Sequence, residues 1–227
     1  MRYPGGKNSA YQKIINLIPP HKVYIEAFAG SGAILRHKRP ALANIAIDVD
    51  TSALEQLRCT IAEGGDTAWL KQVEFLNTDS LAWLASYSFQ GDEFVYADPP
   101  YLFSTRRQHR PIYRYELGEQ DHTTLLGVLK GLRCQVMISG YWSELYAQAL
   151  AGWHVATFEA ITRGGGMATE HLWMNYPRPI ELHDYRYLGE DFRERERIKR
   201  KKQRWAHRLK SMPVLERQAL LSALAEL

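Results

Sequence analysis

The sequence predicts an α/β fold in which a mostly parallel, doubly wound sheet is followed by a basic helical extension. Three observations predict it. Short apolar runs alternate with helical patterns up to about residue 175, glycines or carboxylates directly follow several of these runs, and after Pro177 the chain becomes strongly charged. A chain of 227 residues is long enough for one such domain with an appendage. We therefore expect an α/β domain over residues 1–180 and a helical extension over residues 181–227.

Seven runs rich in β-branched or aromatic residues predict strands. They are Val23–Phe28, Asn44–Ile47, Val73–Leu76, Phe94–Ala97, Gln135–Ser139, His154–Glu159 and His171–Asn175. Helical patterns fill the intervals, at Ser9–Leu17, Ser31–His37, Ser52–Ile61, Ser80–Tyr87, Gln120–Leu132 and Trp142–Leu150. The last two strands have no helix between them, so we expect an antiparallel hairpin at one edge of the sheet, linked by Arg163–Gly166.

The extension is predicted to contain a charged helix over residues 190–210 and a second helix, Val214–Leu227, which begins after Pro213. Between Arg193 and Lys210 there are ten Lys or Arg and two Glu, a local charge of +8 in a chain whose net charge is +4. The bland interpretation is a solvated helix face. So large an excess of one sign cannot be balanced by pairs within the helix, which favours contact with a polyanion. A partner protein remains the alternative, because Leu215, Leu220, Leu221 and Leu224 give the second helix an apolar face.

Composition excludes several other classes. No apolar run approaches the roughly 20 residues of a membrane span. The N-terminal residues lack the apolar segment of a signal peptide, and Cys59 and Cys134 lack disulfide or metal-site spacing. We expect a cytoplasmic protein without a metal. The oligomeric state is left open, and a monomer is compatible with the sequence.

The first predicted strand runs into Ala29-Gly30-Ser31-Gly32. Glycines at a strand-to-helix turn let the backbone approach a ligand closely. A merely tight connection is the alternative. The turn is not the six-residue dinucleotide fingerprint, and no Gly-Lys-Ser/Thr follows, which excludes a P-loop.

Carboxylates follow the next two predicted strands. Asp48 is placed to accept hydrogen bonds from the ribose hydroxyls of a nucleoside cofactor. It could instead cap the next helix, although Asp50 or Thr51 suits that role better. Asp79 could accept from the exocyclic amine of a cofactor adenine, and it or Ser80 could also cap a helix.

The fourth strand closes on Asp98-Pro99-Pro100-Tyr101. An amine conjugated to a ring is a poor nucleophile, because its lone pair is delocalised. If a carboxylate and a backbone carbonyl accept hydrogen bonds from its two N–H groups, they favour the tetrahedral geometry in which the nitrogen is nucleophilic. The two prolines stiffen the turn, and Tyr101 could stack on an extruded base. The alternative is an ordinary turn followed by a core tyrosine.

Taken together, these motifs resemble the Dam-type DNA adenine-N6 methyltransferases, a family that uses S-adenosylmethionine. The resemblance runs from Arg2 to about Asn175, and in the family's order it comprises Arg2-Tyr3-Pro4-Gly5-Gly6-Lys7, Glu26–Gly32, Ile47–Asp50, Asp79 and Asp98–Tyr101. It implies a Rossmann-like methyltransferase fold and a target adenine flipped out of DNA. The implied catalytic residues are Asp98, Pro99, Pro100 and Tyr101. The implied cofactor-binding residues are Tyr3, Gly6, Lys7, Glu26, Phe28, Gly30, Ser31, Gly32, Asp48, Asp79 and Asp98.

The chain departs from the family in two places. Ala27 stands where a proline commonly precedes the phenylalanine, a mild change. Only about twenty residues separate Asp79 from Asp98, so the recognition domain that larger members carry there does not fit. This resemblance implies a compact methylase of the kind found in phages and prophages, and therefore the cytoplasm of a bacterial or phage-infected host cell. A restriction partner, as in restriction-modification systems, is left open.

Sequence readout must then come from elsewhere. The segment Leu102–Glu119 is rich in basic and aromatic residues and issues from the catalytic turn, so we expect it to contact DNA rather than to be a simple surface loop. The expected DNA-binding residues are Arg106, Arg107, Arg110, Tyr113 and Arg114 in this loop, and Arg195, Lys199, Arg200 and Lys202 in the extension. The alternatives are an RNA adenine-N6 methyltransferase and a catalytically inactive nucleic-acid-binding module.

Overall fold

The computed structural model describes residues 7, 10–64, 67–106, 111–161 and 166–226. The chain divides into two compact units, residues 1–183 and residues 184–227. Each unit is described by itself.

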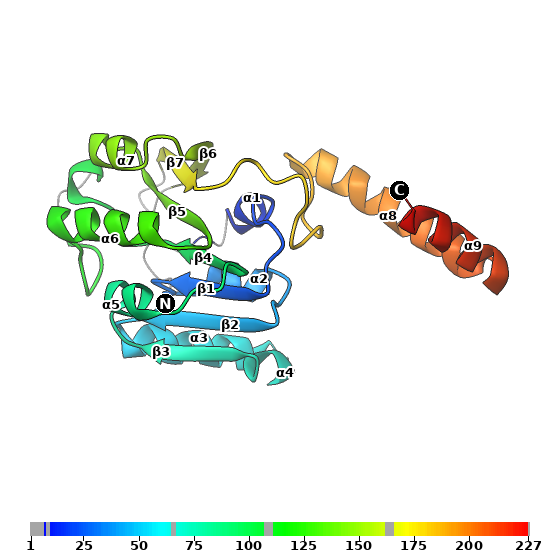
Figure 1. Cartoon of the computed structure of the whole chain (residues 1–227), viewed down its shortest axis with the longest axis horizontal. Coiled ribbons are helices and arrows are strands. Elements are labelled where there is room, and N and C mark those ends of the chain that lie inside the picture. The colour runs from blue at the N-terminus through cyan, green and yellow to red at the C-terminus, as the bar shows by residue number, and fades with distance from the viewer. Residues whose placement is uncertain (1–6, 8–9, 65–66, 107–110, 162–165, 227) are drawn as a thin grey trace. The chain divides into compact units, whose positions relative to one another are not determined.

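The first unit is built on one seven-stranded sheet (Figure 1). Its strands are β1 Val23–Ala27, β2 Ala43–Asp48, β3 Val73–Asn77, β4 Glu93–Ala97, β5 Gln135–Tyr141, β6 His154–Ile161 and β7 Met167–Met174. Their order is β3-β2-β1-β4-β5-β7-β6. Pairs among β1 to β5 are parallel, and β7 runs antiparallel to both β5 and β6. This arrangement confirms the predicted Rossmann-like methyltransferase fold with an antiparallel edge hairpin.

Helices connect the strands at nearly the expected places. They are α1 Tyr11–Ile15, α2 Ala33–His37, α3 Thr51–Glu63, α4 Thr67–Leu70, α5 Ser80–Ser86, α6 Glu119–Gly131 and α7 Glu144–Ala149. The four-residue α4 was not expected, because one turn is too short to show helical periodicity. The start of β7 is four residues earlier than predicted, since the expected strand was read only from its apolar half. The expected hairpin link, 163–166, lies outside the described residues except for Gly166.

Alternation along the strands decides which residues form the core. In β1, Ile25 and Ala27 face one side and pack, with β4 and β5, against Leu84 of α5 and Leu125 of α6. Figure 1 shows α3 on the opposite face of the sheet. The register pairs Ala27 with both Ile47 and Ala97. The carboxyl ends of β1, β2 and β4 are therefore level, and the segments that follow them meet at one edge of the sheet.

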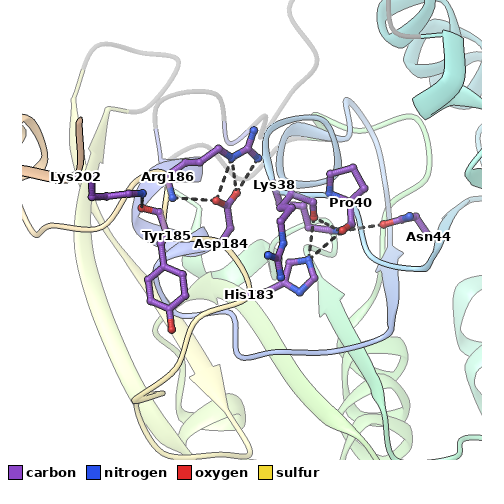
Figure 2. Close-up of polar contacts among 9 residues, drawn as sticks. Lys38, Pro40, Asn44, His183, Asp184, Tyr185, Arg186 and Lys202 are labelled. Carbon is purple, nitrogen blue, oxygen red and sulfur yellow. Dashed lines mark hydrogen bonds and ion pairs between the residues drawn. The ribbon is translucent and has the colours of Figure 1, made fainter. Parts of the chain in front are cut away.

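The end of the first unit is anchored by His183 (Figure 2). Its backbone N–H donates to the carbonyl of Ile18 at 2.9 Å, and its Nε2 lies 3.0 Å from the carbonyl oxygen of Arg39. Its ring stacks on His21 with centroids 3.9 Å apart. Nearby, the buried ammonium of Lys38 donates to Asn44 Oδ1 at 2.9 Å. The side chains of Lys38, His21 and His183 therefore serve the packing of the unit.

The second unit contains α8, Phe192–Ser211, and α9, Val214–Ala225. Asp191 caps α8 by accepting from the N–H of Glu194 at 2.8 Å. Before this helix, Asp184 holds the guanidinium of Arg186 at 2.7 Å, and Lys202 donates to the carbonyl of Tyr185 at 3.3 Å (Figure 2). Among the described residues of α8 and α9, none is buried. The side chains of these two helices are therefore exposed or half-buried.

Candidate active site

The turn after β1 has a backbone that few residues tolerate. Phe28, Gly30 and Gly32 have φ values of 62°, 48° and 58°, all in the left-handed region. A side chain costs about 1–3 kcal/mol in such a conformation, so the strain at Phe28 marks a turn that the surrounding structure enforces. At Gly32 even a Cβ would collide with the side chain of Leu57 in α3. The glycines are needed for the shape of this turn, which supports the tight-connection alternative, and their approach to a ligand stays a prediction.

Asp48, at the end of β2, fixes this turn against the next one. Its Oδ2 accepts from the N–H of Gly30 at 2.7 Å, and its Oδ1 accepts from the N–H of Asp50 at 2.8 Å. Burial raises the pKa of the Asp48 carboxyl, and the backbone hydrogen bonds oppose that rise. Asp50 caps α3 by accepting from Ser52, as expected. The structure thus shows a structural role for Asp48, and its ligand role stays a prediction.

Asp79 follows β3 and caps α5. Its two carboxylate oxygens accept from the N–H groups of Leu81 and Ala82, both at 3.3 Å. These bonds confirm the helix-capping alternative. Because Asp79 also lines the cavity described next, capping and ligand binding are compatible.

One cavity of about 260 Å³ opens at this edge of the sheet. Its lining includes the following residues that the sequence singled out: Lys7, Glu26, Phe28, Gly30, Ser31, Asp48, Asp79, Asp98, Pro100, Tyr113 and Arg114. Gly32, Pro99 and Tyr101 are not part of the lining. Sequence reasoning missed Asp50, Ser80, Tyr96, Tyr115 and Leu117, which also line it. The turns after β1 and β4 therefore share a single cavity.

Glu26 is a buried carboxyl group in this lining. Its Oε2 accepts from the hydroxyl of Tyr24 at 2.9 Å and from the N–H of Leu35 at 2.7 Å. Burial raises the pKa of Glu26 to about 7, against the lowering effect of these two bonds. A cation in the cavity would favour the charged form of Glu26 and would lower this pKa.

Asp98 begins the turn after β4 and is held by two side chains from other segments. Ser139 of β5 donates to Oδ1 at 2.7 Å. The ammonium of Lys7 donates to Oδ1 at 2.6 Å and to Oδ2 at 2.7 Å. The Ser139 contact was not foreseen, because only the parallel pairing of β4 with β5 brings residues 98 and 139 together.

Lys7 is the most buried cation of the site, with 3% of its side chain exposed. It was expected to contact the cofactor. It does line the cavity, but its ammonium binds Asp98, donates to the hydroxyl of Tyr101 at 2.7 Å, and lies 3.6 Å from Glu170 Oε2. Burial lowers the pKa of Lys7, but the charges of Asp98 and Glu170 outweigh burial and raise it above its ordinary value.

Tyr101 lies behind the cavity wall and is buried. Its hydroxyl donates to Glu170 Oε2 at 3.1 Å, and its ring meets that of Tyr141 edge-on, with centroids 4.5 Å apart. Burial raises the pKa of Tyr101 well above its ordinary value, with Asp98 and Glu170 adding to the effect. The hydroxyl is therefore neutral at all ordinary pH values.

Arg106 has a different role from the predicted phosphate contact. It is 5% exposed, its Nε donates to the carbonyl of Tyr101 at 2.6 Å, and its guanidinium forms a bidentate pair with Glu116 at 2.9 and 2.6 Å. Glu116 also accepts from the N–H groups of Ile112 and Tyr113. Arg106 thus ties the loop to the Asp98–Tyr101 turn. A composition-based reading of the loop could not distinguish this arginine from an exposed one.

The end of the same loop contributes to the cavity. Tyr113, Arg114 and Tyr115 are part of its lining. Arg114 is 68% exposed and lies 3.4 Å from Asp50 Oδ1. Burial raises the pKa of Tyr113 to about 12. Of the expected DNA-binding residues in the loop, Tyr113 and Arg114 lie at the cavity, while Arg107 and Arg110 fall outside the described residues.

The remaining predicted residues either lie outside the described part of the chain or lie on α8. Tyr3 and Gly6 lie outside the described residues. Arg195, Lys199, Arg200 and Lys202 all lie on α8 of the second unit, where none of them is buried. Within the part of the chain that the structure describes, no group of three or more His, Cys, Asp or Glu side chains is arranged to hold a metal ion. No described helix is long and apolar enough to cross a membrane.

Comparisons with known proteins give one match to a family model and several similar solved structures. No curated protein sequence matches the chain. Among solved structures, precorrin 8w decarboxylase of Methanobacterium thermoautotrophicum is similar with a TM-score of 0.50 at 13% identity, over 77% of this chain and 94% of that one. SMU.1697c of Streptococcus mutans, in complex with SAH, has a TM-score of 0.48 at 13% identity, over 73% and 96%. An rRNA methylase of Streptococcus thermophilus has a TM-score of 0.47 at 12% identity, over 73% and 93%.

The sequence match is more specific than the structural likeness. Residues 3–90 match the family described as D12 class N6 adenine-specific DNA methyltransferase. This segment contains the glycine turn, Asp48 and Asp79, and it confirms the resemblance for these motifs, whereas Asp98–Tyr101 lies outside the matched residues. The cofactor of that family is S-adenosylmethionine, as the resemblance implied. Residues 3–90 are therefore similar in sequence to the D12 class of N6 adenine-specific DNA methyltransferases, and they lie on a Rossmann-like fold.

Proposed function

We propose that this protein transfers a methyl group from S-adenosylmethionine to N6 of an adenine that is flipped out of DNA. The observation that carries the proposal is the single cavity shared by the glycine turn after β1 and Asp98 after β4. A methyl donor held at the first turn and an amine held at the second would meet there. The sequence match over residues 3–90 supports adenine as the base and DNA as the polymer.

The cavity is chemically suited to this cofactor. Five carboxyl groups line it, those of Glu26, Asp48, Asp50, Asp79 and Asp98, against the basic side chains of Lys7 and Arg114. S-adenosylmethionine carries positive charge and several N–H and O–H donors, which carboxylates accept. When bound, it supplies an electrophilic methyl group on a sulfonium. We assign Asp48 to the ribose and Asp79 to the adenine of the cofactor, with Glu26 favouring its cationic part.

The catalytic turn would act by positioning. Asp98 would accept a hydrogen bond from one N–H of the adenine amine, and the carbonyl of Pro99 would accept the other. The amine nitrogen then forms its bond to the methyl carbon as the bond from sulfur to carbon breaks. The amine loses its proton to Asp98 or to water as the methyl group arrives. Positioning and fixed charges supply most of the rate acceleration in such a reaction.

The base itself would be held by aromatic side chains. Tyr113 and Tyr115 line the cavity and would stack on the base. Stacking on such rings contributes about 1–3 kcal/mol per base. Tyr101, which was expected to stack on the base, is instead buried behind the cavity wall against Tyr141. We assign the phosphate contacts to Arg114 and to the basic residues of α8, Arg195, Lys199, Arg200 and Lys202.

The first test is methylation of duplex DNA, single-stranded DNA and RNA with labelled cofactor. We expect DNA to be the preferred substrate, with the label in N6-methyladenine. Asp98→Ala should lower the rate at least about a hundredfold, because it removes a preorganised charged acceptor, and DNA binding should be retained. Asp92→Ala is the matched control, since Asp92 pairs with Lys22 at the opposite end of β4.

The two alternatives give different results. A preference for RNA over both forms of DNA would assign the same chemistry to an RNA methyltransferase. A wild-type protein that methylates no nucleic acid, and that binds DNA as its Asp98→Ala variant does, would be a binding module. Sequencing modified bases in DNA from cells that express the protein then identifies the methylated site.

A further inference from the structure

A second carboxylate, Glu170, lies beside the catalytic turn. It comes from β7, where the register pairs it with Tyr141 of β5, and its side chain is 10% exposed. Its Oε2 accepts from the hydroxyl of Tyr101 at 3.1 Å and lies 3.6 Å from the ammonium of Lys7. Glu170 lies outside the match to the methyltransferase family, and no role in the proposed reaction has so far been given to it.

The hydrogen bonds of Asp98 create a need for such a group. A carboxylate has about four acceptor positions. Lys7 uses one on each oxygen, and Ser139 uses another on Oδ1. Three of the four positions are therefore in use. An adenine amine that donates to Asp98 would take the one left on Oδ2 and share that oxygen with Lys7, which weakens the bond from Lys7.

Lys7 cannot simply be left without a carboxylate. Its side chain is 3% exposed, and an unpaired buried ammonium is strongly destabilised. Both carboxylates hold it as the charged ammonium through the neutral pH range, because together they outweigh burial and raise its pKa. A shift of roughly 1 Å would bring the ammonium from 3.6 Å to a charge-assisted hydrogen-bond distance from Glu170. Tyr101 already bridges the two groups, since its hydroxyl contacts both.

We propose that Glu170 is a positioning residue that holds the ammonium of Lys7 when the target amine displaces it from Asp98. This inference rests on the proposed function. In the site without a target base, Lys7 is bonded chiefly to Asp98. As the base enters, the ammonium moves toward Glu170, and Asp98 accepts from the amine. The charge of the site is the same before and after the exchange, so no buried charge is left unpaired.

The first experiment is Glu170→Gln, which keeps the shape and removes the charge. We expect kcat to fall about ten- to hundredfold, the equivalent of one charge-assisted hydrogen bond. The dissociation constants for the cofactor and for DNA should stay within about twofold, because Glu170 is not among the described residues that line the cavity. Glu170→Asp should recover part of kcat. The matched control is Glu159→Gln, which changes the exposed partner of Thr169 on the neighbouring strand β6. A kcat for Glu170→Gln within twofold of the wild type would overturn the inference.

A double-mutant cycle tests whether Glu170 acts through Lys7. In a Lys7→Met background, the further change Glu170→Gln should alter kcat by less than about twofold, because no ammonium remains to be held. A full loss in that background would show a direct or purely structural role and would contradict the proposal. If Lys7→Met has no measurable turnover, the same four proteins are compared by the fluorescence of 2-aminopurine placed next to the target adenine, which keeps its N6 amine. The signal reports entry of the base into the site.

Two further readouts separate the causes of failure. A wild-type protein that methylates no DNA refutes the proposed function, and the inference falls with it. An active wild type with an unaffected Glu170→Gln variant refutes the inference alone. Thermal unfolding of all variants tests whether the loss of kcat comes from a loss of stability. If the loss of kcat disappears at a temperature where the variant is fully folded, Glu170 serves stability and not positioning.

Discussion

Charged side chains at the carboxyl edge of the sheet differ from those of α8 in what surrounds them. Lys7 and Arg106 are buried, and each binds a carboxylate at 2.6 Å. On α8, Arg197 and Lys199 are 65% and 59% exposed, and they meet glutamates of their own helix at 3.2 and 3.6 Å. The difference teaches that burial decides what a charge does. Buried charges hold the fold and shape the site, whereas exposed ones contribute little to stability and are available to a partner.

The largest effect expected from this contrast is that of Arg106→Ala. Removing one partner of a buried pair leaves Glu116 uncompensated and releases the carbonyl of Tyr101, which costs about 3–5 kcal/mol of unfolding free energy. Arg114→Ala, in the same loop, should cost less than about 1 kcal/mol, because Arg114 is 68% exposed. Denaturant unfolding of both variants measures the difference. Equal losses would show that burial does not separate these two arginines.

A smaller effect is expected from the pH dependence of Glu26. Burial raises its pKa from 4.5 to about 7 in the folded protein. Between these values the folded chain binds more protons than the unfolded chain, so the contribution of Glu26 to stability falls as the pH rises from about 4.5 to about 7. The full change is about 3 kcal/mol.

The measurement compares wild type with Glu26→Gln in denaturant unfolding at pH 5 and pH 8. The comparison with the variant is needed because other groups also make stability depend on pH. Burial lowers the pKa values of His21 and His122 to about 3 and about 4, so their contribution to stability rises with pH below 6.5, opposite to that of Glu26. We expect the variant to gain stability relative to wild type as the pH rises. A constant difference between the two proteins would mean that Glu26 titrates normally.

The smallest effect on stability is expected on α8. Replacing Arg200, Lys201 and Lys202 together by glutamine should leave the unfolding midpoint of the first unit unchanged. If these side chains contact phosphates, DNA affinity should fall, and the slope of log K against log salt should become less negative by about 0.9 per lost contact. Gln203→Ala on the same helix is the control. An unchanged salt slope would assign α8 to a role other than phosphate binding.

The sequence predicted the site residues that directly follow a strand, but it did not predict those that lie within a strand or in the basic loop. Gly30, Asp48, Asp79 and Asp98 were found because each directly follows a strand, and in a parallel sheet the carboxyl ends share one edge. Their place at the cavity follows from strand order and register alone. For these residues, position along the chain was enough to predict position in the fold.

Ser139, Glu170 and the role of Arg106 could not be found in this way. Ser139 and Glu170 lie in strands, more than 40 residues from the carboxylate or tyrosine that they contact, and only the order β4-β5-β7 brings them to the site. Arg106 stood in a basic loop whose composition indicated phosphate binding. Nothing in the local sequence pairs it with Glu116, ten residues later.

By itself, the sequence determined the α/β class, the glycine turn after β1, the Asp98–Tyr101 turn after β4 and the concentration of positive charge in α8, because each depends on local periodicity, local turn chemistry or simple composition. The tertiary structure alone decided which charges are buried, and with that the engagement of Lys7 by both Asp98 and Glu170. The physical reason is that burial and long-range hydrogen bonds depend on which strands become neighbours, and chain position does not encode that order directly.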